Sequence, residues 1–361
     1  MSSPAPAVSS APPPAAPVAP GAHVRLRYLF PGWYAIVMGL CGLALAWHRA
    51  DALLGEGADA AALVLGLLAA GVFAVLAVAT VLRGRRHPEA WAEDRRHPVR
   101  HTFVAALPIA LLLLGTVGVA LLGPPPSGAP PSLGAVAAWM AATAWTLGAL
   151  AQAGVTLWVL SRWWHPASAG GLAWPGVTPA LLIPIVGNVL VPLAGVPLGQ
   201  TAWSLAQFGV GLMFWPVVLG LIAARLAVAG PWPDRLRPTA FILVAPPAVV
   251  ALSLLQLGAP VAVAWALWGM ALFTALWVGL QTRRMVELPF GLPHWGASFP
   301  LAALTALTLR LATPGTALSV LALALLAATS LIVTALALAT VRGLRDGTLL
   351  VPEPLPPVVK G

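Results

Sequence analysis

The sequence predicts an all-α integral membrane protein, and two observations carry this prediction. The first is composition: only 8% of the 361 residues are charged and 60% are hydrophobic, whereas about 25% of the residues of an ordinary globular protein are charged. The second is the grouping of apolar residues into long runs, each able to cross about 30 Å of hydrocarbon as a helix of about 20 residues. So few charges could not cover a soluble protein, which excludes that class.

Ten apolar runs follow one another along the chain, which predicts ten transmembrane helices. They cover residues 30–48, 61–82, 99–122, 133–160, 178–195, 199–225, 237–257, 260–282, 293–311 and 316–342. Very short links join the fifth run to the sixth and the seventh to the eighth. We therefore expect each of these pairs to form a tight antiparallel hairpin.

The two ends of the chain differ in composition from the part between them. Residues 1–27 begin with a Pro/Ala/Ser-rich stretch that lacks the basic start and apolar core of a signal peptide, so a disordered tail is expected there. Residues 346–361 end in a second Pro-rich stretch and are expected to be a flexible tail. The transmembrane domain is therefore expected over residues 28–345.

The basic residues predict the orientation. If both termini are cytoplasmic, all but two of the 19 Lys and Arg residues fall in cytoplasmic segments, and the exceptions are Arg49 and Arg310. Because basic residues concentrate in cytoplasmic loops, we expect an even number of spans with both termini inside. The formal net charge of +9 then reflects topology, and no nucleic-acid partner is expected. Arg exceeds Lys, and Ala, Gly and Pro are abundant. This composition is typical of a GC-rich coding sequence, which favours a bacterial protein in the inner (plasma) membrane.

Prolines mark every second span. The third span contains Pro108, the fifth Pro184, the seventh Pro246 and the ninth Pro300, while the first begins at Pro31; Pro216 in the sixth is the exception. A proline inside a helix removes a backbone hydrogen bond, and the freed carbonyl needs protein or water around it. We therefore expect five helical hairpins, with an inner ring of odd-numbered, kinked helices around a central pore and an outer ring of even-numbered helices. The alternative is that these prolines are packing kinks in a bundle without a pore.

Five segments, one for each odd-numbered span, resemble the TehA proteins. They are FPGWYAIVMGLCGLALAWHRA (30–50), RRHPVRHTFVAALPIALLLLG (95–115), TPALLIPIVGNVLVPLAG (178–195), LRPTAFILVAPPAVVALS (236–253) and PFGLPHWGASFPLAALTALTLR (289–310). Their order and spacing match over residues 28–350. The chain is therefore identified as a member of the tellurite-resistance/dicarboxylate-transporter family, which includes slow anion channels of plant guard cells, fungal malate permeases and sulfite exporters.

This resemblance implies both an assembly and a gate. It implies ten helices around a pore, a homotrimer with one pore per subunit, and conduction of small inorganic or organic anions across the lipid bilayer. It also implies that a phenylalanine of the ninth span, here Phe299, closes the pore. The residue itself is compatible with this role, because it precedes Pro300, which biases its backbone away from a regular helix, and because an apolar ring in a narrow path gates by excluding water. The alternative is a core phenylalanine that packs one helix against another.

Other residues are candidates for lining the pore or kinking its helices. They are Gly39, Pro108, Pro184, Gly187, Asn188, Pro246, Ser298 and Pro300. The amide of Asn188 could instead form an interhelical hydrogen bond, and the glycines could simply allow close packing of helices.

Three classes of function remain open. No acidic residue falls at the centre of an expected span, whereas coupled transporters commonly carry buried carboxylates or histidines, so the leading prediction is an anion channel. The alternative is a secondary transporter or exporter of C4-dicarboxylate (malate), sulfite or tellurite-related anions, and the third is a membrane scaffold without transport. His97 and His101 have helical spacing but lack a third ligand, so no metal is expected. Without a nucleotide-binding, hydrolase or redox motif, we expect no enzyme activity and no cofactor.

Overall fold

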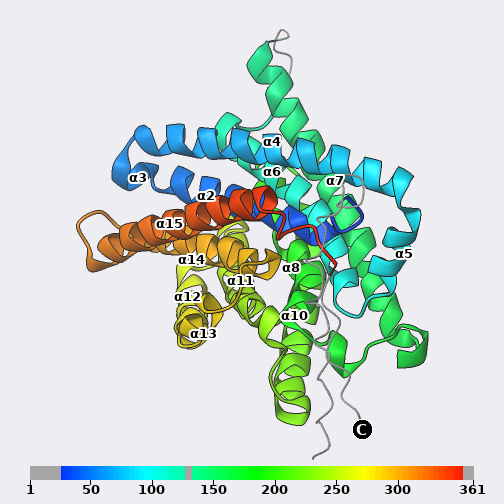
Figure 1. Cartoon of the computed structure of the whole chain (residues 1–361). Helices are drawn as coiled ribbons and strands as arrows, with labels where there is room; N and C mark the ends of the chain where they lie inside the picture. The colour runs from blue at the N-terminus through cyan, green and yellow to red at the C-terminus, as the bar shows by residue number, and fades with distance from the viewer. Residues whose placement is uncertain (1–25, 127–131, 353–361) are drawn as a thin grey trace, which may run out of the picture.

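The computed structural model describes residues 26–126 and 132–352, and these residues form helices joined by turns and loops, without strands (Figure 1). Most of the two expected tails, residues 1–25 and 353–361, lies outside the described part. Within it, Arg27 forms an ion pair of 2.6 Å with Glu93, and the backbone N–H of Leu349 donates to the carbonyl oxygen of Gly343.

Seven helical segments are long and apolar enough to cross a membrane. They are α4 (Gly57–Arg86), η2 with α6 (Arg100–Ala105 and Ala106–Leu122), α7 (Leu133–Ser161) with η3 (Arg162–Trp164), α10 (Thr201–Ala229), η7 with α11 (Asp234–Val244 and Ala245–Gln256), α12 (Val261–Gly279) and α15 (Ala317–Arg345). The protein is therefore a multi-pass helical membrane protein.

The other three expected spans coincide with shorter or less apolar helical segments. They are η1 with α2 (Pro31–Tyr34 and Ala35–Arg49), the succession η6, α8 and α9 (Pro179–Leu182, Ile183–Val189 and Pro192–Gly195), and η8 with α14 (Leu292–Ala297 and Ser298–Leu311). Short helices lie between the long ones: α3 (Asp51–Leu54), α5 (Pro88–Arg96), α13 (Thr282–Val286), η4 (Ala167–Ala169) and η5 (Trp174–Gly176).

Five of the helical segments begin as a 3₁₀-helix and continue as an α-helix. They are η1–α2, η2–α6, η6–α8, η7–α11 and η8–α14, which correspond to the odd-numbered spans of the sequence. The expected kink is therefore a change of helix type. In four of the five, a proline lies in the first turn of the α-helical half: Pro108, Pro184, Pro246 and Pro300. Where i→i+3 bonding gives way to i→i+4 bonding, two N–H groups compete for one carbonyl, so a residue without an N–H fits there.

Burial divides the helices into two classes. In the most apolar window of each segment, 61% of η2–α6 and 78% of η7–α11 are buried, against 17–33% for α4, α7, α10, α12 and α15. The buried residues of the second class form one stripe along each helix; in α12 they are Ala264, Ala271 and Val278, seven residues apart. A helix that buries one such stripe and leaves apolar side chains exposed elsewhere has a surface suited to lipid.

Helices consecutive in the chain pack in pairs, one from each class. The pairs are α2 with α4, α6 with α7, α8 with α10, α11 with α12 and α14 with α15, and Figure 1 shows α14 beside α15. Glycines allow the closest approach. In the α6–α7 pair a Cβ atom on Gly148 would lie only 2.7 Å from the Cα of Leu112, so that a side chain there would force the two backbones apart.

Candidate functional site

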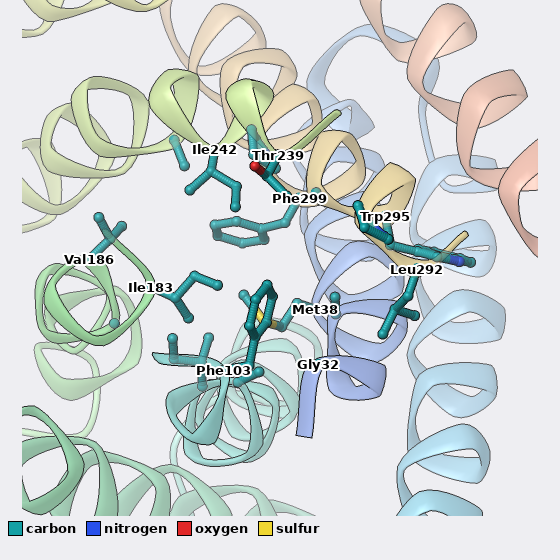
Figure 2. A pocket seen from close by; sticks show the side chains of 18 of the residues that line it. Gly32, Met38, Phe103, Ile183, Val186, Thr239, Ile242, Leu292, Trp295 and Phe299 are labelled. Atoms are coloured by element: carbon teal, nitrogen blue, oxygen red, sulfur yellow. The ribbon is translucent and has the colours of Figure 1, made fainter. Parts of the chain in front are cut away.

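A cavity lies where the five two-part helical segments change from 3₁₀ to α (Figure 2). Its wall includes one residue at or next to the start of each α-helical half: Ala35, Ala106, Ile183, Ala245 and Phe299. The cavity volume is about 70 Å³, which is space for a few water-sized molecules. All five buried segments therefore converge on one narrow space.

The wall of this cavity is apolar and carries no charged side chain. The polar side-chain groups of its lining residues already have partners. The hydroxyl of Thr239 donates to the carbonyl oxygen of Leu236 at 2.5 Å, and the indole N–H of Trp295 donates to Oγ1 of Thr340 at 2.9 Å. A narrow space with an apolar wall binds water only weakly. Dewetting of such a constriction is one way in which channels close.

Phe299 occupies the middle of this space. It is 8% exposed, and its ring projects from α14 between the side chains of Ile242, Ile183 and Phe103 (Figure 2). On the other side of the ring lies α2, because a Cβ atom built on Gly42 would be 3.0 Å from the ring carbon Cδ2 of Phe299. The phenylalanine that the sequence singled out thus has α2 behind it and the cavity in front.

A second aromatic ring faces the same space from η2. Phe103 lines the cavity opposite Phe299 (Figure 2), and its ring meets that of Phe30 edge to face, with 5.7 Å between the centroids. Phe103 and Met38 were not among the candidates expected from the sequence. For two other lining residues the sequence did hold a signal: Ile183 and Ala245, like Phe299, each directly precede a proline, and all three line the cavity.

The residues predicted from the sequence differ in their relation to the cavity. Phe299, Pro300 and Gly187 line the cavity, whereas Gly39, Pro108, Pro184, Asn188, Pro246 and Ser298 are not among its lining residues. Gly39 and Ser298 lie against each other between α2 and α14, and the Ser298 hydroxyl donates to the carbonyl oxygen of Trp295 at 2.7 Å. Pro108, Pro184 and Pro246 begin the α-helical halves that shape the cavity.

Asn188 belongs to a buried polar cluster behind the cavity wall. Its amide nitrogen donates to Oγ1 of Thr156 in α7 at 2.8 Å and to the carbonyl oxygen of Pro184 at 2.9 Å. Its amide oxygen accepts from Nε2 of Gln207 in α10 at 3.1 Å. These hydrogen bonds connect α7, α8 and α10.

The two histidines with helical spacing bond to the backbone. Nδ1 of His97 accepts from the N–H groups of Val99 and Arg100, each at 3.1 Å, and Nδ1 of His101 lies 3.0 Å from the carbonyl oxygen of His97. Among the described residues, no group of three or more His, Cys, Asp or Glu side chains is placed to hold a metal ion.

Comparison with known proteins relates this architecture to channels and transporters. The family model described as voltage-dependent anion channel, SLAC1, matches residues 28–341. An uncharacterized transporter of Methanocaldococcus jannaschii is 24% identical over 306 residues, which cover 78% of this chain and 83% of the relative.

Two further relatives have more specific names. The tellurite resistance protein TehA homolog of Haemophilus influenzae is 24% identical over 276 residues, covering 76% of this chain and 78% of the relative. The S-type anion channel SLAH2 of Arabidopsis thaliana is 25% identical over 227 residues, covering 62% of this chain and 40% of the relative. Since the family model spans most of the sequence, including all five segments that form the cavity, the chain belongs to the SLAC1 family of voltage-dependent anion channels.

Proposed function

We propose that the protein is an anion channel whose path runs between the five two-part helical segments and is closed by the ring of Phe299. One observation carries the proposal: five segments from all parts of the chain converge on one uncharged cavity, and Phe299 projects into it. Removal of that ring leaves a wider apolar passage that can hold water and a small anion. Membership in a family of anion channels supports the same function.

The proposed architecture is ten transmembrane helices in five hairpins, with η1–α2, η2–α6, η6–α8, η7–α11 and η8–α14 as the inner ring. The contacts among these segments support a closed ring. α2 packs against α6 and α14, α11 packs against α8 and α14, and η2 packs against α8. In the bilayer, α4, α7, α10, α12 and α15 form the outer ring, and their exposed apolar side chains contact lipid.

The proposed assembly is a homotrimer in a bacterial inner membrane, with one path per subunit and both termini in the cytoplasm. The distribution of basic residues supports the orientation, because Arg49 and Arg310 are the only Lys or Arg residues that it leaves outside. The same basic cytoplasmic segments raise the local concentration of anions at one mouth.

Selection among anions follows from the apolar wall. The longer helices α2, α6, α11 and α14 begin at the cavity, and helix starts carry a partial positive charge that favours anions. Without charged side chains in the wall, an anion must shed much of its water. We therefore expect permeability among halides to rise as hydration energy falls, and an order unrelated to hydration would contradict this account.

A second candidate is a coupled transporter or exporter of C4-dicarboxylate, sulfite or tellurite-related anions. The names of the relatives from M. jannaschii and H. influenzae favour it. The cavity favours the channel, since its lining contains no ionisable side chain that could relay a proton.

The deciding experiment is the anion current across a planar bilayer that contains wild-type protein, Phe299→Ala or Phe208→Ala. Phe208 is a matched control, since it is a 5% exposed phenylalanine of α10 that packs in the core and does not line the cavity. We expect a large current through Phe299→Ala and little through the other two. Equal small currents in all three, with saturable uptake of substrate into vesicles, would favour the transporter and remove the gate from Phe299.

A further inference from the structure

Arg49 and Arg310 are two basic residues at the ends of adjacent helices. Arg49 is the last residue of α2 and Arg310 the next-to-last residue of α14, and these two helices pack directly against each other. Within the described part of the chain, neither guanidinium has a hydrogen bond or an ion pair, whereas Arg27, Arg83, Arg100 and Arg237 each pair with an acid. The two charges are close enough to influence each other electrostatically.

The register of α2 and α14 places the two arginines at one level. Gly39 lies against Ser298 and Gly42 lies against Ala302. Because both helices run in the same direction with the same rise per residue, seven further residues along each lead to Arg49 on α2 and to residue 309, next to Arg310, on α14. The side-by-side packing of α2 and α14 therefore extends to the ends of both helices, where Arg49 and Arg310 lie.

Both arginines also lie above the cavity on the face that lines it. Arg49 follows Met38 by 11 residues, and Arg310 follows Phe299 by 11 residues, which is close to three turns of an α-helix. Met38 and Phe299 both line the cavity. Gln256, the last residue of α11, follows the lining residue Ala245 by the same interval.

We propose that Arg49 and Arg310 form a binding site for a small anion, such as a halide, nitrate or carboxylate, at the outer mouth of the path. The inference rests on the proposed function, which makes the α2 and α14 ends the outer mouth. Two unpaired guanidinium groups repel each other, and an anion between them relieves this repulsion through charge-assisted hydrogen bonds. The site raises the anion concentration three helical turns from Phe299, outside a cavity whose wall is uncharged.

The test is current through Phe299→Ala with and without added Arg49→Gln and Arg310→Gln, in potassium chloride. For anions entering from the α2 and α14 ends, we expect the double replacement to lower the current about tenfold at low salt. The loss should shrink at high salt, where the field of the arginines is screened. Arg284→Gln is the matched control, because Arg284 is an exposed arginine of α13 that the proposed topology places on the opposite, cytoplasmic side. An unchanged current at low salt would overturn the site and leave the channel intact.

A binding measurement separates the site from conduction. We expect sodium nitrate to raise the melting temperature of the otherwise wild-type protein in detergent, and expect Arg49→Gln with Arg310→Gln to abolish most of that rise. Arg284→Gln should keep it. If no variant conducts but the nitrate effect depends on the two arginines, the site stands and the channel proposal fails. A nitrate effect that is equal in all variants would overturn the site.

Discussion

The ring of Phe299 lies so close to Gly42 that a Cβ atom built on Gly42 would come within 3.0 Å of ring carbon Cδ2 and within 3.1 Å of the Cβ of Ala302. Glycine at this point of α2 therefore makes room for the ring on one side, while the cavity makes room on the other. The position of the proposed gate depends on a residue from a different helix, more than two hundred positions away in the sequence.

Gly42→Ala tests this relationship. The added methyl group overpacks the contact, and we expect a loss of about 1–3 kcal/mol in the free energy of unfolding. In a Phe299→Ala background the ring is absent, so the same replacement should cost about 1 kcal/mol less. Melting temperatures of the wild type, both single variants and the double variant measure this coupling. Strictly additive effects would show that Gly42 does not hold the ring in place.

The polar cluster around Asn188 predicts a loss of stability without a change of selectivity. Asn188→Ala removes hydrogen bonds to Thr156, Pro184 and Gln207, which we expect to cost about 1–3 kcal/mol because the partners remain buried. The halide order of a conducting Phe299→Ala variant should be unaltered, since Asn188 is not among the cavity-lining residues. Thr274→Ala is the control, because its hydroxyl donates within its own helix to Met270. A changed halide order would place Asn188 in the path after all.

Buried charges at the junction of α4, α5 and η2 predict a large effect. Asp94 is fully buried, forms an ion pair with Arg83 at 2.7 Å and accepts a hydrogen bond from Arg100 at 3.1 Å. Arg83 is itself 2% exposed and donates through Nε to the carbonyl oxygen of Arg27. Asp94→Asn leaves the buried Arg83 without a counter-charge, and we expect a cost of about 3–5 kcal/mol.

The neighbouring acid provides the control for that prediction. Glu93 pairs with Arg27 at 2.6 Å, but both side chains are substantially exposed, so solvent screens the pair. Thermal unfolding should therefore show a large drop in melting temperature for Asp94→Asn and little change for Glu93→Gln. Similar melting temperatures for the two variants would mean that Asp94 and Arg83 do not act as a buried pair.

The sequence predicted where the helices break but not how they break. Pro108, Pro184 and Pro300 each lack a backbone N–H, which predicts an irregularity in the helix. At each of them a 3₁₀-helix changes to an α-helix. The segment before each proline is a 3₁₀-helix because of its packing against neighbouring segments, which one sequence does not reveal. The span expected over residues 178–195 is accordingly three short helices, η6, α8 and α9.

Side-chain partners across helices were beyond prediction from one sequence. The sequence left two roles possible for Asn188, lining the pore or forming an interhelical hydrogen bond. Its hydrogen bonds are with Thr156 and Gln207, which come from two other helices. Phe299 could be selected because it precedes a proline and matches a family pattern. Phe103 could not, since its place opposite Phe299 comes from the convergence of η2 and α14 on one cavity.

Phe103 supplies the remaining prediction, because its ring faces Phe299 across a cavity of only about 70 Å³. If the passage is closed by dewetting, removal of either ring widens it and favours water. Phe103→Ala should therefore raise the anion current of the wild type, and Phe103→Ala with Phe299→Ala should conduct more than either single variant. Phe73→Ala is the control, because Phe73 also makes an edge contact with an aromatic ring, that of Tyr34 at 5.6 Å, but does not line the cavity. A Phe103→Ala current no larger than that of Phe73→Ala would limit the closure to Phe299 alone, whereas a larger current would make the gate a pair of aromatic rings held by two separate helices.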